Sequence, residues 1–249
     1  MRKSFQGVMN IIRFNCHLYF IALAVIIFLF SLAIYANGTI YLFCITVALL
    51  TLVVISVSLV ASFYIYDFSA LYSLNWISAD GTERRIVNIH AGFDETSSLL
   101  QEKFGKAELK VLDFYNPLLH TEISIRRARK AYPPFPDTRH ISTSDTKLVD
   151  DSTDKIFVIF AAHEIREEEE RVCFFRELGK KLSANGQIYV TEHLRDLPNF
   201  LAYNLGFFHF YSGKTWRSTF VNANLEVIRE IKTTPFITTF ILRKNGNTL

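Results

Sequence analysis

Two histidine–glutamate pairs each follow an apolar run in the second half of the chain. The first pair is His163-Glu164 and the second is Glu192-His193. A histidine, whose ordinary pKa is about 6.5, can take a proton from an N–H or O–H group near neutral pH, and a carboxylate can orient it. We predict that these four residues are catalytic, with His163 as the base and Glu164 or Glu192 as its orienting group.

The same residues allow other interpretations. Each pair can cap a neighbouring helix or pair with the charged residues beside it, Arg166 after the first pair and Arg195 and Asp196 after the second. Two histidines and two carboxylates are also ligands that zinc accepts, but no linear spacing fixes such a site. We therefore predict a catalytic pocket and no bound metal.

A further acid ends a predicted nucleotide-binding βαβ unit. The unit has a strand over 85–89, a turn over 90–94, a helix over 95–106 and a strand over 109–113 that ends in Asp113. Such a turn brings backbone N–H groups and a helix N-terminus to a ligand, and the acid can bind ribose hydroxyls. Only Gly92 stands where the dinucleotide fingerprint has three glycines, so an ordinary α/β crossover fits this stretch equally well.

Short apolar strands alternate with helical patterns in the rest of the chain. We expect strands at 155–161, 187–191, 225–232 and 236–243, and helices at 121–131, 167–182, 200–210 and 215–222. This alternation predicts a doubly wound, mostly parallel α/β sheet of Rossmann-like type. The last two strands are too close in sequence for a parallel crossover, so they must form an antiparallel hairpin. Ligands of such sheets bind beyond the carboxyl ends of the strands, where both histidine–glutamate pairs fall.

Two nearly uncharged segments precede this domain. Residues 14–35 and 40–66 each reach the roughly 20 residues that cross a bilayer as a helix, and a short polar turn joins them. Basic residues flank the pair but are missing from the turn, which places both ends in the cytoplasm by the positive-inside tendency. These flanking residues are Arg2, Lys3, Arg13, Arg84 and Arg85.

The chain therefore divides into three parts. We predict a transmembrane helical hairpin at 1–68, an interfacial linker at 69–80 and a cytoplasmic α/β domain at 81–249, held at the inner (cytoplasmic) membrane. The formal charge of +3 is modest and forms no long basic stripe, so we expect no nucleic-acid partner. Cys16, Cys44 and Cys173 have neither disulfide nor metal spacing and are expected to be reduced packing residues.

An α/β sheet that ends in an antiparallel hairpin resembles the class I S-adenosylmethionine-dependent methyltransferases more than the nicotinamide dehydrogenases. The resemblance covers about 82–244: residues 88–94 stand at the first motif, Asp113 matches the ribose-binding acid, and 144–146 resembles the segment that recognises adenine. The usual acid of the first motif is Asn88 here, and His90 and Asp94 replace glycines. The resemblance implies S-adenosylmethionine as cofactor, bound by Asn88, His90, Ala91, Gly92, Asp113, Phe114, Asp145, Thr146 and Ala161.

The resemblance and the hairpin together imply an enzyme at a membrane. The expected activity is methyl transfer from S-adenosylmethionine to a lipophilic or membrane-associated acceptor, either a small molecule or a lipid. The alternative is a methyltransferase-like domain that has lost turnover and serves as an anchored binding scaffold, as the altered first motif suggests. A nicotinamide oxidoreductase is disfavoured by the terminal hairpin.

Overall fold

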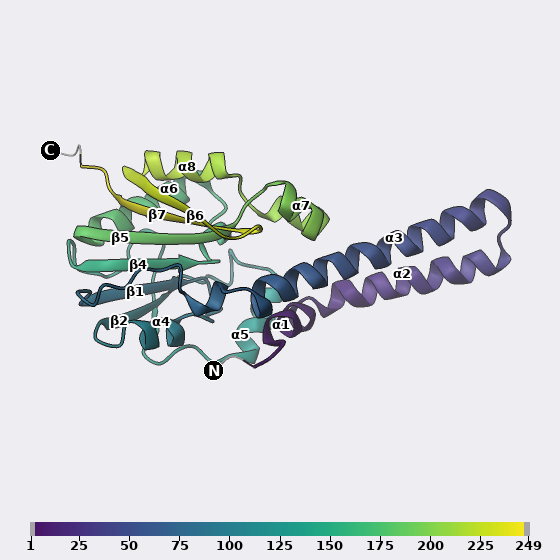
Figure 1. Cartoon of the computed structure of the whole chain (residues 1–249), viewed down its shortest axis with the longest axis horizontal. Helices are drawn as coiled ribbons and strands as arrows, with labels where there is room; N and C mark the ends of the chain where they lie inside the picture. The colour runs from purple at the N-terminus through teal and green to yellow at the C-terminus, as the bar shows by residue number, and fades with distance from the viewer. Residues whose placement is uncertain (1–2, 247–249) are drawn as a thin grey trace.

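Seven strands form one sheet in the computed structural model, and two long helices project from one end of it (Figure 1). The structure describes residues 3–246, the side chain at position 205 excepted, so Arg2 and the last three residues of the predicted domain lie outside the described part. The strands are β1 (Arg85–His90), β2 (Glu108–Asp113), β3 (Arg139–His140), β4 (Thr153–Ile159), β5 (Leu182–His193), β6 (Leu225–Thr234) and β7 (Ile237–Lys244).

The helical elements follow the predicted order, with one addition at the N-terminus. The α-helices are α1 (Gln6–Phe14), α2 (Cys16–Tyr35), α3 (Gly38–Phe63), α4 (Ser97–Lys103), α5 (Ile123–Ala131), α6 (Glu168–Lys181), α7 (Leu197–Tyr203) and α8 (Gly213–Asn222). Shorter turns are the π-helical η1 (Tyr64–Phe68) and the 3-10 turns η2 (Leu71–Ser73), η3 (Ala162–Glu164) and η4 (Asn204–His209). Helix α1 was not predicted, and α4 is shorter than expected.

The strand order is β3-β2-β1-β4-β5-β7-β6. β1 to β5 run parallel to one another, whereas β7 pairs antiparallel with both β5 and β6. The predicted Rossmann-like sheet with a terminal antiparallel hairpin is therefore confirmed. β1 and β2 pair in a register that sets His90 opposite Asp113, so the turn and the acid of the βαβ unit meet at one edge.

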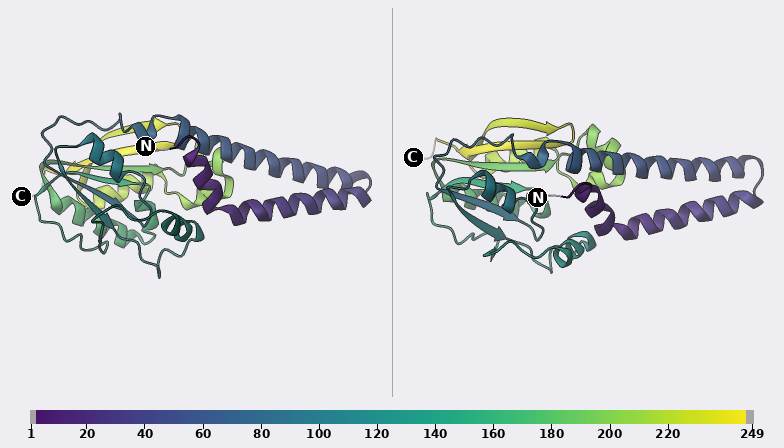
Figure 2. Two further views of the ribbon diagram at one scale, coloured as in Figure 1. Left: turned by 90° about the horizontal axis from the view of Figure 1, so that it is seen from below. Right: turned by 60° about the horizontal axis from the view of Figure 1, so that its bottom comes forward.

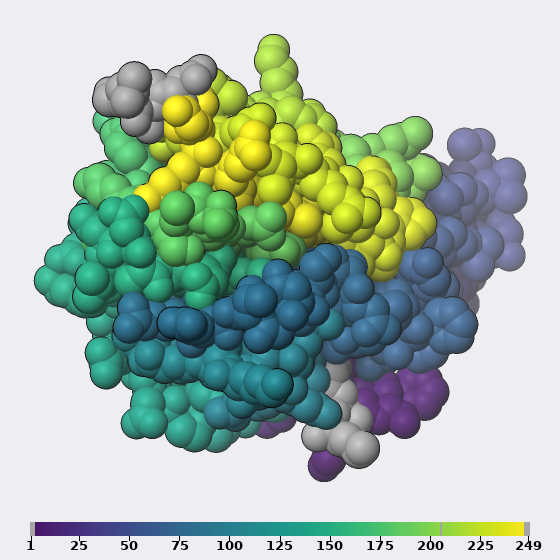
Figure 3. Space-filling view, turned by 60° about the vertical axis from the view of Figure 1, so that its left-hand side comes forward, coloured from purple at the N-terminus to yellow at the C-terminus, as the bar shows by residue number. Residues whose placement is uncertain are grey.

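The sheet is buried on both faces, as its continuous apolar strands require. On one face, Phe174, Phe175 and Leu178 of α6 and Trp216 and Phe220 of α8 pack against the strands. On the other face the sheet is covered by Leu100 and Phe104 near α4 and by Leu74 and Ile77 of the predicted linker. In the space-filling view the blue segment that follows α3 lies across this face beside the yellow C-terminal strands (Figure 3). The linker is thus part of the core of the α/β domain.

Helices α2 and α3 form an antiparallel hairpin that stands away from the sheet in every view (Figure 2). Small side chains, Ala33, Cys44 and Ala48, are buried where the two helices touch. Outward-facing side chains are apolar and exposed: Ile34 is 77% and Val60 is 67% exposed. By length and composition both helices could cross a membrane. Cys44 is a buried packing residue as predicted, but Cys173 is exposed because it lies on the outer side of α6.

The base of the hairpin is bound to the edge of the sheet by α1 and α5. The carboxylate of Asp67, in η1, accepts hydrogen bonds from the backbone N–H groups of Gly7 and Val8, both at 2.7 Å, and so caps α1 from outside the helix. A Cβ at Gly7 would lie 2.4 Å from Cβ of Tyr66, so only glycine allows α1 to approach η1 so closely. On its other side α1 contacts α5.

Candidate functional site

A cavity of about 250 Å³ lies beyond the carboxyl ends of β1 and β4, where ligands of open α/β sheets bind. Its floor includes Ala91 and Phe160, which follow these two strands. Its walls include Asn10 and Phe14 of α1 and Tyr66 of η1, so the base of the helical hairpin closes the side opposite the sheet. Neither the α/β domain nor the hairpin forms this cavity alone.

His163 lies in this cavity between two carboxylates. Its Nδ1 atom is 2.7 Å from Oε2 of Glu192, and its Nε2 atom is 3.3 Å from Oε1 of Glu164. Burial alone lowers the pKa of His163, but the charges of Glu192 and Glu164 and their hydrogen bonds outweigh burial and raise the pKa to about 10. The imidazole is thus protonated at neutral pH, with Glu192 fixing its orientation.

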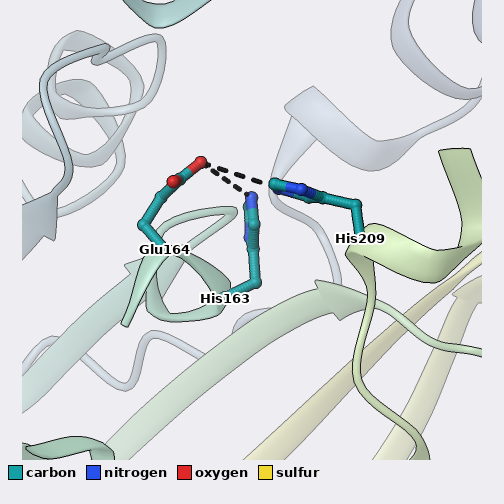
Figure 4. Close-up of side chains that lie close together, drawn as sticks. All are labelled: His163, Glu164 and His209. Carbon is teal, nitrogen blue, oxygen red and sulfur yellow. Dashed lines mark ion pairs between the residues drawn. The ribbon is translucent and has the colours of Figure 1, made fainter. Parts of the chain in front are cut away.

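Glu164 and His209 complete this cluster (Figure 4). His209, at the end of η4, has its Nε2 atom 3.8 Å from Oε1 of Glu164. Burial raises the pKa of Glu164, but hydrogen bonds to His163 and His209 reverse this effect and lower it. The predicted grouping of His163 with Glu164 and Glu192 is therefore present, and its catalytic role stays a prediction.

His193 does not line the cavity, although it is close to it. Its Nδ1 atom lies 2.9 Å from Oδ1 of Asn199, which can only accept, so Nδ1 carries the proton. Its Nε2 atom then accepts from the hydroxyl of Tyr66 at 2.7 Å. Burial lowers the pKa of His193 to about 4, so the ring is neutral. It contacts two residues of the cavity wall, Tyr66 and Phe160, but does not line the cavity with His163, although both histidines were predicted to be catalytic.

Of the cofactor residues predicted at the end of β1 and in the turn after it, some hold the loop in place and others line the cavity. Nδ2 of Asn88 donates to the hydroxyls of Thr96 at 3.0 Å and Ser97 at 2.8 Å, so this side chain holds the loop before α4. Nδ1 of His90 accepts from the N–H of Gly92 at 3.1 Å, which leaves the proton on Nε2. His90 is 4% exposed, lines the cavity with Ala91, and its Nε2 has no hydrogen-bond partner. A ligand in the cavity can accept from this N–H.

Asp113 lies at the end of β2, and its carboxylate already forms a salt bridge with an arginine. Nη1 of Arg129, from α5, is 2.6 Å from Oδ2 of Asp113, and Oδ1 accepts from the backbone N–H of Tyr115 at 2.9 Å. The guanidinium also lies 4.4 Å from the centre of the Tyr115 ring. Gly92 has a φ of +96°, and a Cβ there would be 2.9 Å from Nη1 of Arg129. The arginine thus lies between the turn and the acid.

The other predicted cofactor residues lie apart from the cavity. Phe114 lines a neighbouring groove of about 320 Å³ together with His140 and the segment 141–143. The exposed carboxylate of Asp145 pairs with Lys147, and the hydroxyl of the buried Thr146 donates to Glu177 at 3.2 Å. Ala161 is buried in the core below η3. Asp145, Thr146 and Ala161 line neither hollow, whereas the residues just before the predicted adenine segment line the groove.

Three acidic or basic residues that line the cavity, Glu95, Glu122 and His209, were not among the predicted site residues. Glu95 lines it and accepts hydrogen bonds from Asn10 at 3.3 Å and from the hydroxyl of Tyr72 at 2.8 Å. It provides a carboxylate near the turn where Asn88 lacks one. His209 belongs to an aromatic run at 203–216, which from the sequence fits core packing or, slightly better given the apolar hairpin, the roof of an apolar acceptor pocket. Glu95 could have been predicted from the sequence because it directly follows the predicted cofactor turn at 90–94. No linear spacing indicated His209.

No protein-family model matches the sequence, and a search of curated proteins found no match. Solved structures do match. One is a SAM-dependent methyltransferase from Aquifex aeolicus, with 14% identity over 64% of this chain and 81% of that chain, and a TM-score of 0.47. Another is a type 11 methyltransferase from Sulfolobus solfataricus, with 17% identity, 68% and 89% coverage and a TM-score of 0.45.

A third match is an O-methyltransferase family 2 protein from Planctomyces limnophilus in complex with apigenin. It has 14% identity, covers 71% of this chain and 56% of that chain, and has a TM-score of 0.49. Two further matching structures contain S-adenosylmethionine or its demethylated product. The structural neighbours are thus class I S-adenosylmethionine-dependent methyltransferases. Their TM-scores lie below 0.5, so the fold assignment rests on the strand order and directions given above.

Proposed function

We propose that this protein is an S-adenosylmethionine-dependent methyltransferase, anchored by its helical hairpin, that acts on a lipophilic acceptor at the cytoplasmic face of the membrane. One observation carries the proposal. The cavity lies at the carboxyl ends of β1 and β4, next to the predicted cofactor loop, and the base of the apolar hairpin forms its opposite wall. An acceptor dissolved in a bilayer around α2 and α3 would meet the cavity where α1 and η1 close it.

Three groups favour S-adenosylmethionine as the methyl donor. His90 offers a free N–H, Glu95 offers a carboxylate toward the cofactor's ammonium group, and Asp113 is the acid that would accept from the ribose hydroxyls. The obstacle is Arg129, because it engages Asp113 in the present arrangement. Ribose hydroxyls would have to compete with this guanidinium. The cofactor, when bound, supplies an electrophilic methyl group on a sulfonium.

The chain's own residues would position the acceptor and handle its proton. Phe14 and Phe160 give the cavity apolar walls, and Tyr66 offers a hydroxyl backed by the neutral His193. His163 faces the cavity through Nε2, held by Glu192. Because this imidazole already holds a proton at neutral pH, it can act on the acceptor only after that proton has been displaced.

The proposal is tested by calorimetry on the full-length protein in detergent micelles. We expect binding of S-adenosylmethionine and of its demethylated product, and a gain of 14 daltons (one CH₂) in a lipid of an extract incubated with protein and cofactor. His163→Ala should keep cofactor binding and lose the transfer. If neither cofactor form binds the wild type, the proposal fails.

The second candidate function is an anchored scaffold without turnover. The pairing of Arg129 with Asp113 and the structural use of Asn88 favour it, since both remove groups that would otherwise hold the cofactor. The mass measurement on the lipid extract separates the two functions. A scaffold would show no methyl transfer to any lipid fraction, even when the cofactor binds.

A further inference from the structure

We propose that His163, Glu164 and His209 form a site for one divalent transition-metal ion that opens into the cavity. The three ligand atoms, Nε2 of His163, Oε1 of Glu164 and a ring nitrogen of His209, all lie within 4.8 Å of one another. They come from two segments that are distant in sequence, η3 after β4 and the end of η4. Figure 4 shows the three side chains pointing toward one common region.

The spacing of these atoms is close to that of a metal site. Oε1 of Glu164 is 3.3 Å from Nε2 of His163 and 3.8 Å from Nε2 of His209. Bonds of about 2.0–2.2 Å from zinc to nitrogen or oxygen, at angles of about 90–110°, separate neighbouring ligand atoms by about 3.0–3.5 Å. Small movements of the two imidazoles would therefore bring all three ligand atoms to bonding distance of one ion.

Carboxylates stand behind both histidines. Glu192, which is buried, lies 2.7 Å from Nδ1 of His163, on the side of the ring away from Glu164. Glu122 lies 3.1 Å from Nδ1 of His209. Metal-binding histidines almost always donate their second ring N–H to such a group, which fixes the tautomer and raises the basicity of the ligand nitrogen. A histidine that only packs or caps needs no carboxylate on both ring nitrogens, as His163 has.

The local charge also suits a divalent cation. Glu164, Glu192 and Glu122 bring three negative charges to two imidazoles, and Arg166 and the second ring proton of His163 oppose them. An ion bound at Nε2 of His163 would displace this proton, as metal binding to histidine does.

Nη2 of Arg166 lies against both ring nitrogens of His209, 2.5 Å from Nδ1 and 2.7 Å from Nε2. The guanidinium therefore competes with an ion for this ligand and with Nδ1 of His209 for Glu122. The side chain of Arg166 is 42% exposed and has room to withdraw into solvent.

Three protein ligands leave coordination positions open toward the cavity, as in catalytic rather than structural metal sites. Two histidines and one carboxylate suit zinc, iron(II), cobalt(II) or manganese(II) better than magnesium or calcium, which prefer oxygen ligands. Binding of the ion does not depend on the proposed function. Its use, to hold and polarise a heteroatom of the methyl acceptor, does rest on that function.

The test uses full-length protein in detergent, freed of metal by dialysis against a chelator. Zinc is titrated in competition with a fluorescent chelator, and cobalt(II) is titrated while its visible absorption is recorded. We expect one ion per chain and a cobalt spectrum of four- or five-coordinate type. Glu192→Gln should weaken binding by about 10–100-fold, the usual loss when a second carboxylate behind a ligand is removed. His209→Ala and Glu164→Gln should weaken it more.

Two further variants allow the proposal to be tested even if a variant of a metal ligand unfolds. Arg166→Gln removes the competing cation, so zinc should bind more tightly than to the wild type, a gain that loss of structure cannot produce. His140→Ala removes an exposed histidine near Asp113, outside the cluster, and should leave binding unchanged. The proposal is overturned if no stoichiometric ion binds, if His209→Ala and Glu164→Gln bind as well as the wild type, or if His140→Ala abolishes binding.

The same preparation separates this proposal from the proposed function. Zinc binding without any binding of S-adenosylmethionine would leave the metal site standing and reject the methyltransferase. The opposite result is cofactor binding and methyl transfer that persist unchanged in metal-free protein, together with no cobalt spectrum. It would reject the metal site and support the methyltransferase.

Discussion

Replacement of Arg129 by alanine should tighten the binding of S-adenosylmethionine. Under the proposed function, the cofactor's ribose would compete for the carboxylate of Asp113 with Arg129, which donates a hydrogen bond of 2.6 Å to it. A hydrogen bond between charged groups contributes about 1.5–3 kcal/mol. Because the side chain of Arg129 is 33% exposed, water replaces part of this interaction, and we take the lower end, about 1.5–2 kcal/mol.

This free energy corresponds to a change of about 10–30-fold in the dissociation constant, at about 1.4 kcal/mol for each factor of ten. The cofactor-free variant should also be less stable, with a thermal midpoint roughly 3–8 °C lower, because a buried carboxylate loses its partner. The assay is calorimetry of the two proteins in the same detergent, with differential scanning fluorimetry for the midpoint.

Arg126→Ala is the matched control, since this exposed arginine lies on the same helix, one turn before Arg129. It should change neither quantity. Asp113→Asn should weaken binding, because the amide accepts less strongly than a carboxylate. If Arg129→Ala weakens the binding of S-adenosylmethionine, Arg129 is a ligand of the cofactor rather than its competitor, and the reasoning is refuted.

Two further predictions concern stability. The pKa of His193 is about 4 in the folded protein and about 6.5 in the unfolded chain, so the unfolded chain binds the extra proton between these values. The free energy of unfolding should therefore fall by up to about 3 kcal/mol as the pH drops from about 6.5 to about 4. Thermal unfolding of His193→Gln should show no such dependence on pH. If the dependence is the same in this variant, other groups cause it. A chain that begins at Gly81 lacks Leu74 and Ile77 from the core and α1 from the cavity, so it should lose fixed tertiary structure in near-ultraviolet circular dichroism. A chain that begins at Ser69 retains both side chains and is the matched comparison.

The sequence alone was sufficient for the fold of the α/β domain. Apolar runs alternate with helical patterns at lengths that permit few arrangements, and the short connection before β7 excludes a parallel partner. The carboxyl ends of parallel strands necessarily share one edge, so His163, Glu192 and Asp113 were correctly expected on the same side of the sheet. The two apolar helices followed in the same way from length and composition.

Only the tertiary structure decided which of these side chains meet. Arg129 reaches Asp113 from the helix predicted at 121–131, whose partner on the sheet the sequence did not indicate, and His209 joins His163 from an aromatic run far along the chain. The linker fills the core with Leu74 and Ile77, and α1 closes the cavity. Periodicity reports whether a residue is buried, but not which distant residue lies opposite. That choice depends on how whole elements pack, and here it determines which groups remain available to a ligand.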